Sequence, residues 1–164
     1  MRSPSRCPQR RAGLFGMFFV ATAFIAAASA CDAAGPDDLD ELQEARALWV
    51  SLGITDYAYV LQRGCFCTLE SIGPVRITVR AGVVESLVYV ASGGPVIQGG
   101  ELWPTVDGLF DVVERAIDGE ADKVTAVFDA SRGYPLTVDI DYIEQAIDDE
   151  LTLTVSSFTP LVAP

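Results

Sequence analysis

The chain has 164 residues, with 11 Lys and Arg, 23 Asp and Glu and no histidine, so its formal net charge is −12. Half of the residues are hydrophobic, which is too apolar for an intrinsically disordered chain. The acidic balance repels phosphates and anionic headgroups, and this argues against nucleic-acid binding and against electrostatic attachment to a membrane. Without histidine, catalytic triads and metal sites built on imidazole are excluded.

The first 30 residues have the three parts of a secretory signal peptide. Four arginines and no acid lie in the first eleven residues, an apolar stretch covers 12–28, and Ala28-Ser29-Ala30 precedes Cys31. This pattern predicts a removable signal peptide over 1–30. A retained transmembrane helix is the alternative, but an apolar stretch of 17 residues is at the lower limit for crossing a bilayer.

Small residues directly before Cys31 resemble the lipobox of bacterial lipoproteins, in which the cysteine receives a diacylglyceryl group and becomes the first mature residue. Ala28 stands where the lipobox usually has leucine, and Ala-x-Ala also suits the general signal peptidase. Residues 31–38 are polar, as a flexible tether would be. Removal of the four arginines leaves seven basic residues against 23 acidic ones, a net charge of −16. We therefore expect lipid on Cys31 to hold the protein on a membrane of the cell envelope; a secreted or soluble periplasmic protein is the alternative.

The mature chain has the usual size of one domain, which we place at 39–160. Apolar residues at helical spacing predict a first helix over 37–52, before Gly53. An extended segment over 56–67 comes next. Alternating apolar and polar residues then predict a strand over 75–80, and after a short turn its partner strand follows. That partner covers 83–90.

A glycine-rich loop over 91–101 leads to the second helix, for which Thr105 is a good N-cap and which ends before Gly119. Apolar and polar residues alternate again in the rest of the chain and predict strands over 124–129, 134–141 and 151–156. Residues 142–150 are ambiguous between a helical turn and a wide connection.

The order helix, three strands, helix, three strands predicts a two-layer α+β domain. Strands joined by short turns pair antiparallel, and a sheet with one apolar face needs a cover. We expect an antiparallel sheet of about six strands with the two helices packed on one face. The shared layout of the two halves is consistent with an internal duplication.

The mature chain contains the following motifs in order: Trp49, Tyr57-x-Tyr59, Cys65-x-Cys67, Val75-Arg76-Ile77-x-Val79 with Gly82, Thr105-Val106-x-x-Leu109-Phe110-Asp111, and Asp129-x-x-x-Gly133-Tyr134-Pro135 followed by Asp141. Over about 45–158 they resemble a domain-of-unknown-function family of bacterial secreted or lipid-anchored envelope proteins. The resemblance implies an envelope location and this fold, and it brings no catalytic residues. The layout is also distantly similar to β-lactamase-inhibitor-like and PepSY-type modules.

Cys65 and Cys67 remain as a pair if Cys7 leaves with the signal peptide and Cys31 is lipidated. Alternate residues of a strand lie ~6.6 Å apart, and a disulfide tolerates up to about 6.8 Å between Cα atoms. A disulfide therefore forms if the strand kinks, which Gly64 permits, and an oxidising compartment favours it. A redox-active pair, a soft-metal site and free or intermolecular thiols are the alternatives.

Carboxylates are frequent in the second half, where Asp139 and Asp141 share a strand face and 148–150 form an acidic run. No calcium-binding loop is present in the sequence. We interpret these residues as a solvated acidic surface in which some acids pair with Arg76 and Arg80. We expect no metal, no cofactor and no catalytic residue.

Aromatic residues have structural interpretations. Tyr57 and Tyr59 share a strand face with Leu61, which favours core packing over a ligand platform. Trp103 before the second helix is expected to fix that helix on the sheet; the alternative is that it lines a groove with the 93–100 loop.

The function expected from these observations is non-catalytic binding of an envelope protein, through the exposed sheet face or the 91–101 loop. The alternative is a thiol-redox or Cu(I)-handling protein that uses Cys65 and Cys67.

Overall fold

The computed structural model describes residues 36–146 and 148–162, so the predicted signal peptide and Cys31 lie outside the described residues. The helices and strands are, in chain order, α1 (Pro36–Ser51), β1 (Tyr57–Gly64), β2 (Val75–Arg80), β3 (Val83–Tyr89), α2 (Val106–Asp118), β4 (Lys123–Phe128), β5 (Pro135–Asp141) and β6 (Leu151–Pro160). Two short 3-10 helices, η1 (Leu69–Ser71) and η2 (Gly100–Leu102), lie in the connections. The predicted order of two helices and six strands is confirmed.

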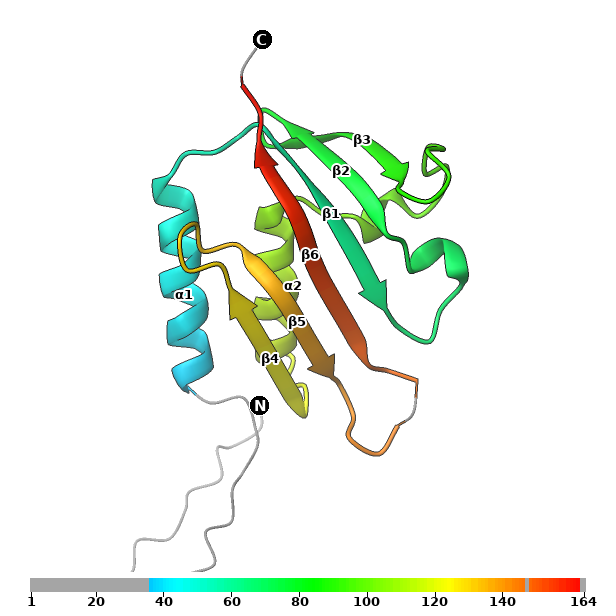
Figure 1. The fold of residues 1–164 in the computed structure, drawn as a ribbon. Coiled ribbons are helices and arrows are strands. Elements are labelled where there is room, and N and C mark those ends of the chain that lie inside the picture. Colours follow the sequence, from blue (N-terminus) through cyan, green and yellow to red (C-terminus); the bar gives the residue numbers. More distant parts are fainter. Residues whose placement is uncertain (1–35, 147, 163–164) are drawn as a thin grey trace, which may run out of the picture. The chain divides into compact units, whose positions relative to one another are not determined.

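The six strands form one open antiparallel sheet in the order β3-β2-β1-β6-β5-β4 (Figure 1). Within each half of the chain, consecutive strands are neighbours because short connections favour antiparallel pairing. The two halves meet at the centre of the sheet, where β1 pairs with β6. This central pairing joins strands that lie far apart in the sequence.

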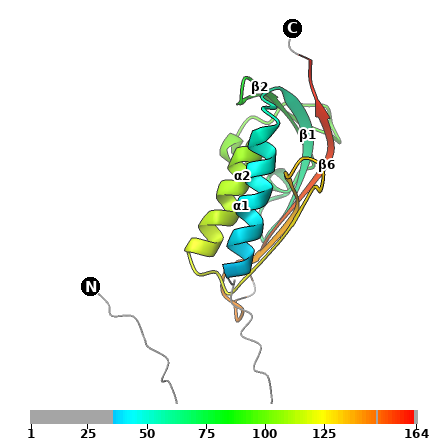
Figure 2. The same cartoon turned by 90° about the vertical axis from the view of Figure 1, so that its left-hand side faces the viewer.

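Both helices lie on the same face of the sheet and pack side by side, as predicted (Figure 2). Arg46 of α1 links them, because its guanidinium binds Asp111 at 2.6 Å and Glu114 at 3.1 Å, both on α2. The predicted N-cap is confirmed, since the Thr105 side chain accepts a hydrogen bond from the Gly108 N–H. No helix in the part of the chain that the structure describes is long and apolar enough to cross a bilayer.

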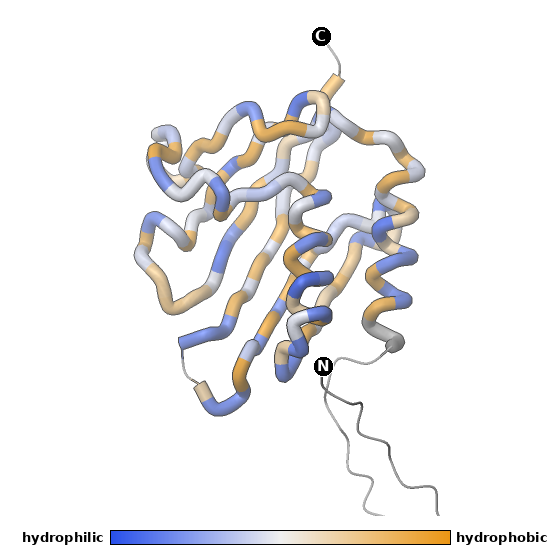
Figure 3. Tube along the Cα trace, turned by 180° about the vertical axis from the view of Figure 1, so that it is seen from behind, coloured by the Kyte–Doolittle hydropathy of each residue, from blue (hydrophilic) through white to orange (hydrophobic). Residues whose placement is uncertain are grey.

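The core lies between the helices and the sheet. Hydrophobic and hydrophilic residues alternate along the chain (Figure 3), and none of the buried residues that the structure describes is polar or charged. α1 contributes Leu42 and Trp49 to the core. The other large side chains that are almost completely buried come from β1, β2, β5, α2 and the segment before α2, and they are Tyr57, Tyr59, Leu61, Val75, Ile77, Val79, Trp103, Val106, Leu109, Phe110, Val113 and Val138.

The last strand departs from the expected regular alternation. It extends to Pro160, and its register against β1 shifts at Ser157, which has a φ of 53°. Such a bulge inserts one residue and changes which face the following side chains occupy. Phe158 therefore packs against the core on the same side as Val155, although these two residues are an odd number apart. The ambiguous connection before β6 contains a turn, with no helix among its described residues 142–146 and 148–150.

Candidate functional site

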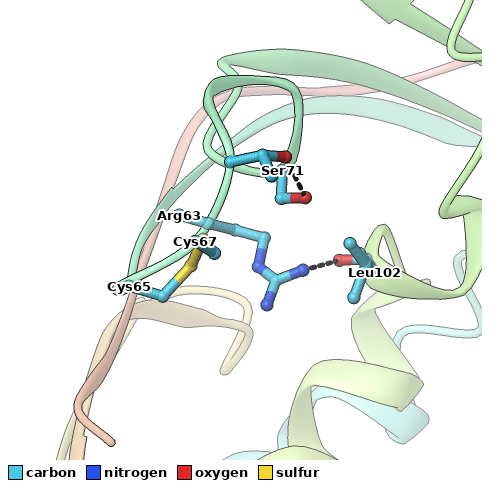
Figure 4. Close-up of a disulfide and its surroundings, with 6 residues drawn as sticks. Arg63, Cys65, Cys67, Ser71 and Leu102 are labelled. Atoms are coloured by element: carbon cyan, nitrogen blue, oxygen red, sulfur yellow. Dashed lines mark hydrogen bonds between the residues drawn. A yellow bond between two sulfur atoms is a disulfide. The ribbon is translucent and has the colours of Figure 1, made fainter. Parts of the chain in front are cut away.

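The cysteine pair lies in a turn directly after β1, and the predicted kink is confirmed. β1 ends at Gly64, and the Cys67 N–H donates a hydrogen bond to the Cys65 carbonyl oxygen at 2.9 Å. This i to i+2 bond tightens the chain into a γ-turn. It brings the two Cα atoms to 5.3 Å, within disulfide distance (Figure 4). Cys65 is half-buried and Cys67 is exposed.

The tyrosines of β1 hold the start of α2 on the sheet. The Tyr59 hydroxyl donates a hydrogen bond to the Pro104 carbonyl oxygen. The Tyr57 hydroxyl accepts one from the Val106 N–H at 2.9 Å. Burial raises the pKa of Tyr57 to about 12 and the pKa of Tyr59 well above its ordinary value. Both tyrosines and Trp103 belong to the core, which confirms their predicted structural roles.

Two loops form a groove beside the cysteine turn, and we call it the η1–η2 groove. It has a volume of about 590 Å³ and lies between the segment around η1 and the glycine-rich loop before α2. Its lining residues are Thr68, Glu70, Ser71, Tyr89, Pro95, Ile97, Gln98, Gly99 and Leu102. Its volume is within the range of ordinary ligand-binding clefts.

Hydrogen bonds fix both walls of the η1–η2 groove. The Tyr89 hydroxyl donates to the Glu70 carbonyl oxygen at 3.0 Å, which ties β3 to η1. The Tyr89 N–H donates to the Gly94 carbonyl oxygen at 2.9 Å, and the Val96 N–H donates to the Leu87 carbonyl oxygen at 3.0 Å. The glycine-rich loop is therefore held against the edge strand β3 in a defined conformation.

Three large apolar side chains are exposed along the two segments that form this groove. Phe66 lies between the two cysteines, Leu69 begins η1, and Ile97 lines the groove from the opposite loop. Their relative exposures are 83%, 83% and 81%. Side chains of this size are mostly buried in folded proteins, and several exposed together are typical of a binding surface.

Arg63 enters a second, smaller groove, which we call the Arg63 groove. Its volume is about 230 Å³, and it lies between α2, β1 and β6. Its lining residues are Arg63, Glu101, Leu102, Pro104, Gly108, Asp111, Val112, Arg115, Leu151 and Leu153. The Arg63 guanidinium lies over the Trp103 ring, 5.9 Å from its centroid, and burial lowers its pKa.

The open face of the sheet is mostly polar, although Ala58, Val60 and Val127 also lie on it. It carries Gln62, Arg76, Asp139, Thr152 and Thr154 on neighbouring strands. The Thr152 hydroxyl donates a hydrogen bond to the Asp139 carboxylate at 2.9 Å. The glycine-rich loop exposes Ile97 to a greater extent than this face exposes Val127, so an apolar partner gains more contact at the loop.

Ion pairing with acidic residues was predicted for Arg76 and Arg80, and of these two described arginines only Arg80 forms such pairs. Arg80 lies 3.4 Å from Asp56 and 3.9 Å from Glu85. A hydrogen bond from Thr55 lowers the pKa of Asp56, and Arg80 lowers it further. Among residues 36–146 and 148–162, no three His, Cys, Asp or Glu side chains gather as metal ligands would.

Sequence reasoning missed Phe66, Leu69, Ile97 and Arg63. The signal for Arg63 was present, since it continues the alternation of Tyr59 and Leu61 and therefore lies on the strand face that meets the helices. The three apolar residues had no such signal. Their exposure depends on how two loops fold back against each other.

The comparison with protein families agrees with the resemblance that the sequence motifs indicate. Residues 41–160 match a family described only as being of unknown function. No curated protein and no solved structure matches the chain. The distant likeness to β-lactamase-inhibitor-like and PepSY-type modules therefore stays a prediction. The resemblance to a domain-of-unknown-function family is confirmed over most of the chain, which belongs to the family of unknown function DUF6174.

Proposed function

We propose that this protein is a bacterial cell-envelope lipoprotein, held on a membrane by lipid on Cys31, whose domain binds another envelope protein without catalysing a reaction. The signal pattern over 1–30, the polar segment over 31–38 and the net charge of −16 after signal removal support the anchoring. A domain this acidic gains no attraction from anionic lipids, so a covalent lipid is the attachment that fits it.

The observation that carries the binding role is the apolar rim of the η1–η2 groove. Ile97 lines a groove of about 590 Å³, and Leu69 lies in the sequence between two of its lining residues. Both side chains, and that of Phe66 shortly before them in the chain, are more than 80% exposed. Exposed apolar area in contact with water is unfavourable by about 25 cal/mol per Å². Burial of these three side chains by a partner is therefore a direct source of binding free energy.

The partner segment that fits this groove is apolar and basic. Glu70 is the one charged residue in the lining, and the whole mature domain is strongly acidic. A basic segment is attracted to this surface, whereas an acidic one is repelled. Because hydrogen bonds already hold both walls, the groove loses little conformational entropy when the segment binds.

The chemistry of the groove supports binding over catalysis. Its lining contains one carboxylate, from Glu70, and no cysteine or lysine, and the chain has no histidine. A nucleophilic mechanism needs a nucleophile beside a general base, and the base is most often a histidine. The groove offers apolar contact area and hydroxyl groups instead.

Site-specific photo-crosslinking in native membranes tests this proposal. A photoreactive amino acid placed at Leu69 or Ile97 is expected to capture the same envelope protein. The same amino acid at Val50 of α1, which is 63% exposed and lines neither groove, is the matched control. Leu69→Ser and Ile97→Ser, each combined with a crosslinker at the other position, are expected to reduce the capture.

The proposal is wrong if positions 69 and 97 give no common adduct, or if position 50 gives the same one. It is also wrong if the captured segment is acidic. The anchor is tested separately by the intact mass of protein from native membranes and by Cys31→Ser. This variant is expected to lack the lipid mass and to leave the membrane fraction, while its groove still captures the partner.

A further inference from the structure

Arg63 is the feature of the domain that the proposed function leaves unused. It lies on β1 two residues after Leu61, on the strand face that otherwise carries core side chains. Its side chain reaches from the strand toward Leu102 in the loop before α2 (Figure 4). A half-buried guanidinium thus occupies the layer between sheet and helices.

The guanidinium is poorly satisfied by the described residues. It has five N–H donors, and its single hydrogen bond is from Nη1 to the Leu102 carbonyl oxygen at a long 3.4 Å. Nε is buried and has no partner. Among the ion pairs of the described residues, none includes Arg63, in a chain with 23 acidic residues. An unmatched buried donor costs free energy, and a ligand that accepts its hydrogen bonds recovers that cost.

The surroundings of Arg63 form a site with a cationic and an apolar part. Arg115 of α2 lines the same groove, and so do Leu102, Val112 and Leu153. Asp111 also lines it, but its carboxylate is already bound to Arg46 at 2.6 Å. The guanidinium of Arg63 therefore faces a groove that offers apolar contacts together with unmatched N–H donors.

We propose that the Arg63 groove binds the carboxylate of a small apolar acid, either a free acid or the C-terminal residue of a peptide. The planar guanidinium matches a carboxylate through two parallel N–H···O bonds. A volume of about 230 Å³ is that of roughly eight water molecules at about 30 Å³ each, which admits one short side chain with its carboxylate. The net charge of −16 and Glu101 in the lining repel a doubly charged phosphate more strongly than a singly charged carboxylate.

This site does not depend on the proposed partner binding at the η1–η2 groove. The two grooves share one lining residue, Leu102, and are otherwise formed by different residues. Loss of the partner at the first groove would leave the carboxylate site intact. Loss of the carboxylate site would likewise leave partner binding intact, because none of the exposed apolar residues Phe66, Leu69 and Ile97 lines the Arg63 groove.

The test is an NMR titration of amide resonances of the full chain with isovalerate, and with its uncharged analogue isovaleramide as the control. Isovalerate is expected to cause saturable shifts around Arg63, Leu102 and Arg115, and isovaleramide is expected to cause none. N-acetyl-Gly-Leu with a free or an amidated C-terminus distinguishes the two sources. Tighter binding of the free-carboxylate peptide than of isovalerate assigns the site to a peptide C-terminus, and the reverse order assigns it to a free acid.

Arg63→Gln is expected to weaken isovalerate binding at least tenfold, while Arg76→Gln, which removes the same charge from the exposed face of β2, leaves it unchanged. Arg63→Lys keeps the positive charge but loses the two parallel N–H donors of the guanidinium, and it is expected to weaken isovalerate binding at least threefold. If Arg63→Gln does not fold, Arg63→Lys provides the test of the carboxylate site. The proposal is overturned by equal binding to a folded Arg63 variant, by equal binding of isovaleramide or inorganic phosphate, or by the absence of saturable shifts with both carboxylate probes.

Discussion

Replacement of both Cys65 and Cys67 by serine separates a structural disulfide from a thiol-redox or copper site. The pair closes a ring of three residues, and the γ-turn hydrogen bond between Cys67 and Cys65 already holds the backbone of that ring. The exposed Cys67 contributes little burial. We therefore expect the double variant to fold and to keep both grooves.

The size of the effect follows from the ring. In the chain-entropy description, closing a loop of three residues removes about 5.4 cal/mol/K from the unfolded state, which is roughly 1.6 kcal/mol at 25 °C. Loss of the half-buried Cys65 sulfur adds a few tenths of a kcal/mol at most. The expected decrease in the free energy of unfolding is therefore about 1–2 kcal/mol.

Urea unfolding of the wild type and the double variant measures this difference, and a matching m-value shows that both states remain comparable. Because the partner is proposed to bind the apolar rim, capture through position 69 or 97 is expected to survive the replacement. A loss above about 4 kcal/mol would refute the loop-entropy reasoning. Loss of a phenotype or of stoichiometric Cu(I) binding, without loss of stability, would favour the redox or copper alternative.

Three further predictions concern the framework that carries both grooves. Tyr57→Phe leaves the buried Val106 N–H without its acceptor and is expected to decrease the free energy of unfolding by about 1–3 kcal/mol in urea. Gly133→Ala is expected to cost more than about 3 kcal/mol, because Gly133 has a φ of 79° and a Cβ there would clash with the Ala45 carbonyl oxygen of α1. The third prediction is alkaline lability: burial raises the pKa of Tyr57 to about 12 and that of Tyr59 further. Because these folded-state pKa values exceed the unfolded value of about 10, stability is fully present below pH 10 and decreases as the pH rises toward 12, as unfolding measured against pH will test.

Matched controls keep these predictions specific. Tyr142→Phe removes a hydroxyl from an exposed side chain and is expected to change stability by less than about 0.5 kcal/mol. Gly82→Ala places alanine at a φ of 75° with nothing within 4 Å of the added Cβ. It is expected to cost only about 1–2 kcal/mol, the ordinary price of a left-handed residue. A Gly133→Ala variant as stable as Gly82→Ala would contradict the close approach to α1. Ionisation of Tyr57 or Tyr59 in the folded protein at pH 10 would contradict the third prediction.

The elements and their order can be predicted from local patterns in the amino-acid sequence. Helical spacing of apolar residues, the Thr105 cap and strict alternation in β2 are local patterns, since each is set by the period of one segment. The kink at the cysteine pair was expected from the sequence as the condition for a disulfide, and Gly64 permits it. The core positions of Tyr57 and Tyr59 followed from the same alternation.

The features on which both candidate sites depend come from contacts between distant segments, which form only in the folded domain. The central pairing of β1 with β6, the bulge at Ser157 and the approach of Gly133 to α1 join segments far apart in the chain. The η1–η2 groove exists because two loops from different parts of the sequence are held together. Arg63 Nε has no hydrogen-bond partner among the described residues, because the groups packed around it come from segments far away in the chain. Local periodicity determines which face a residue occupies, whereas the neighbour it meets there depends on the packing of the whole domain.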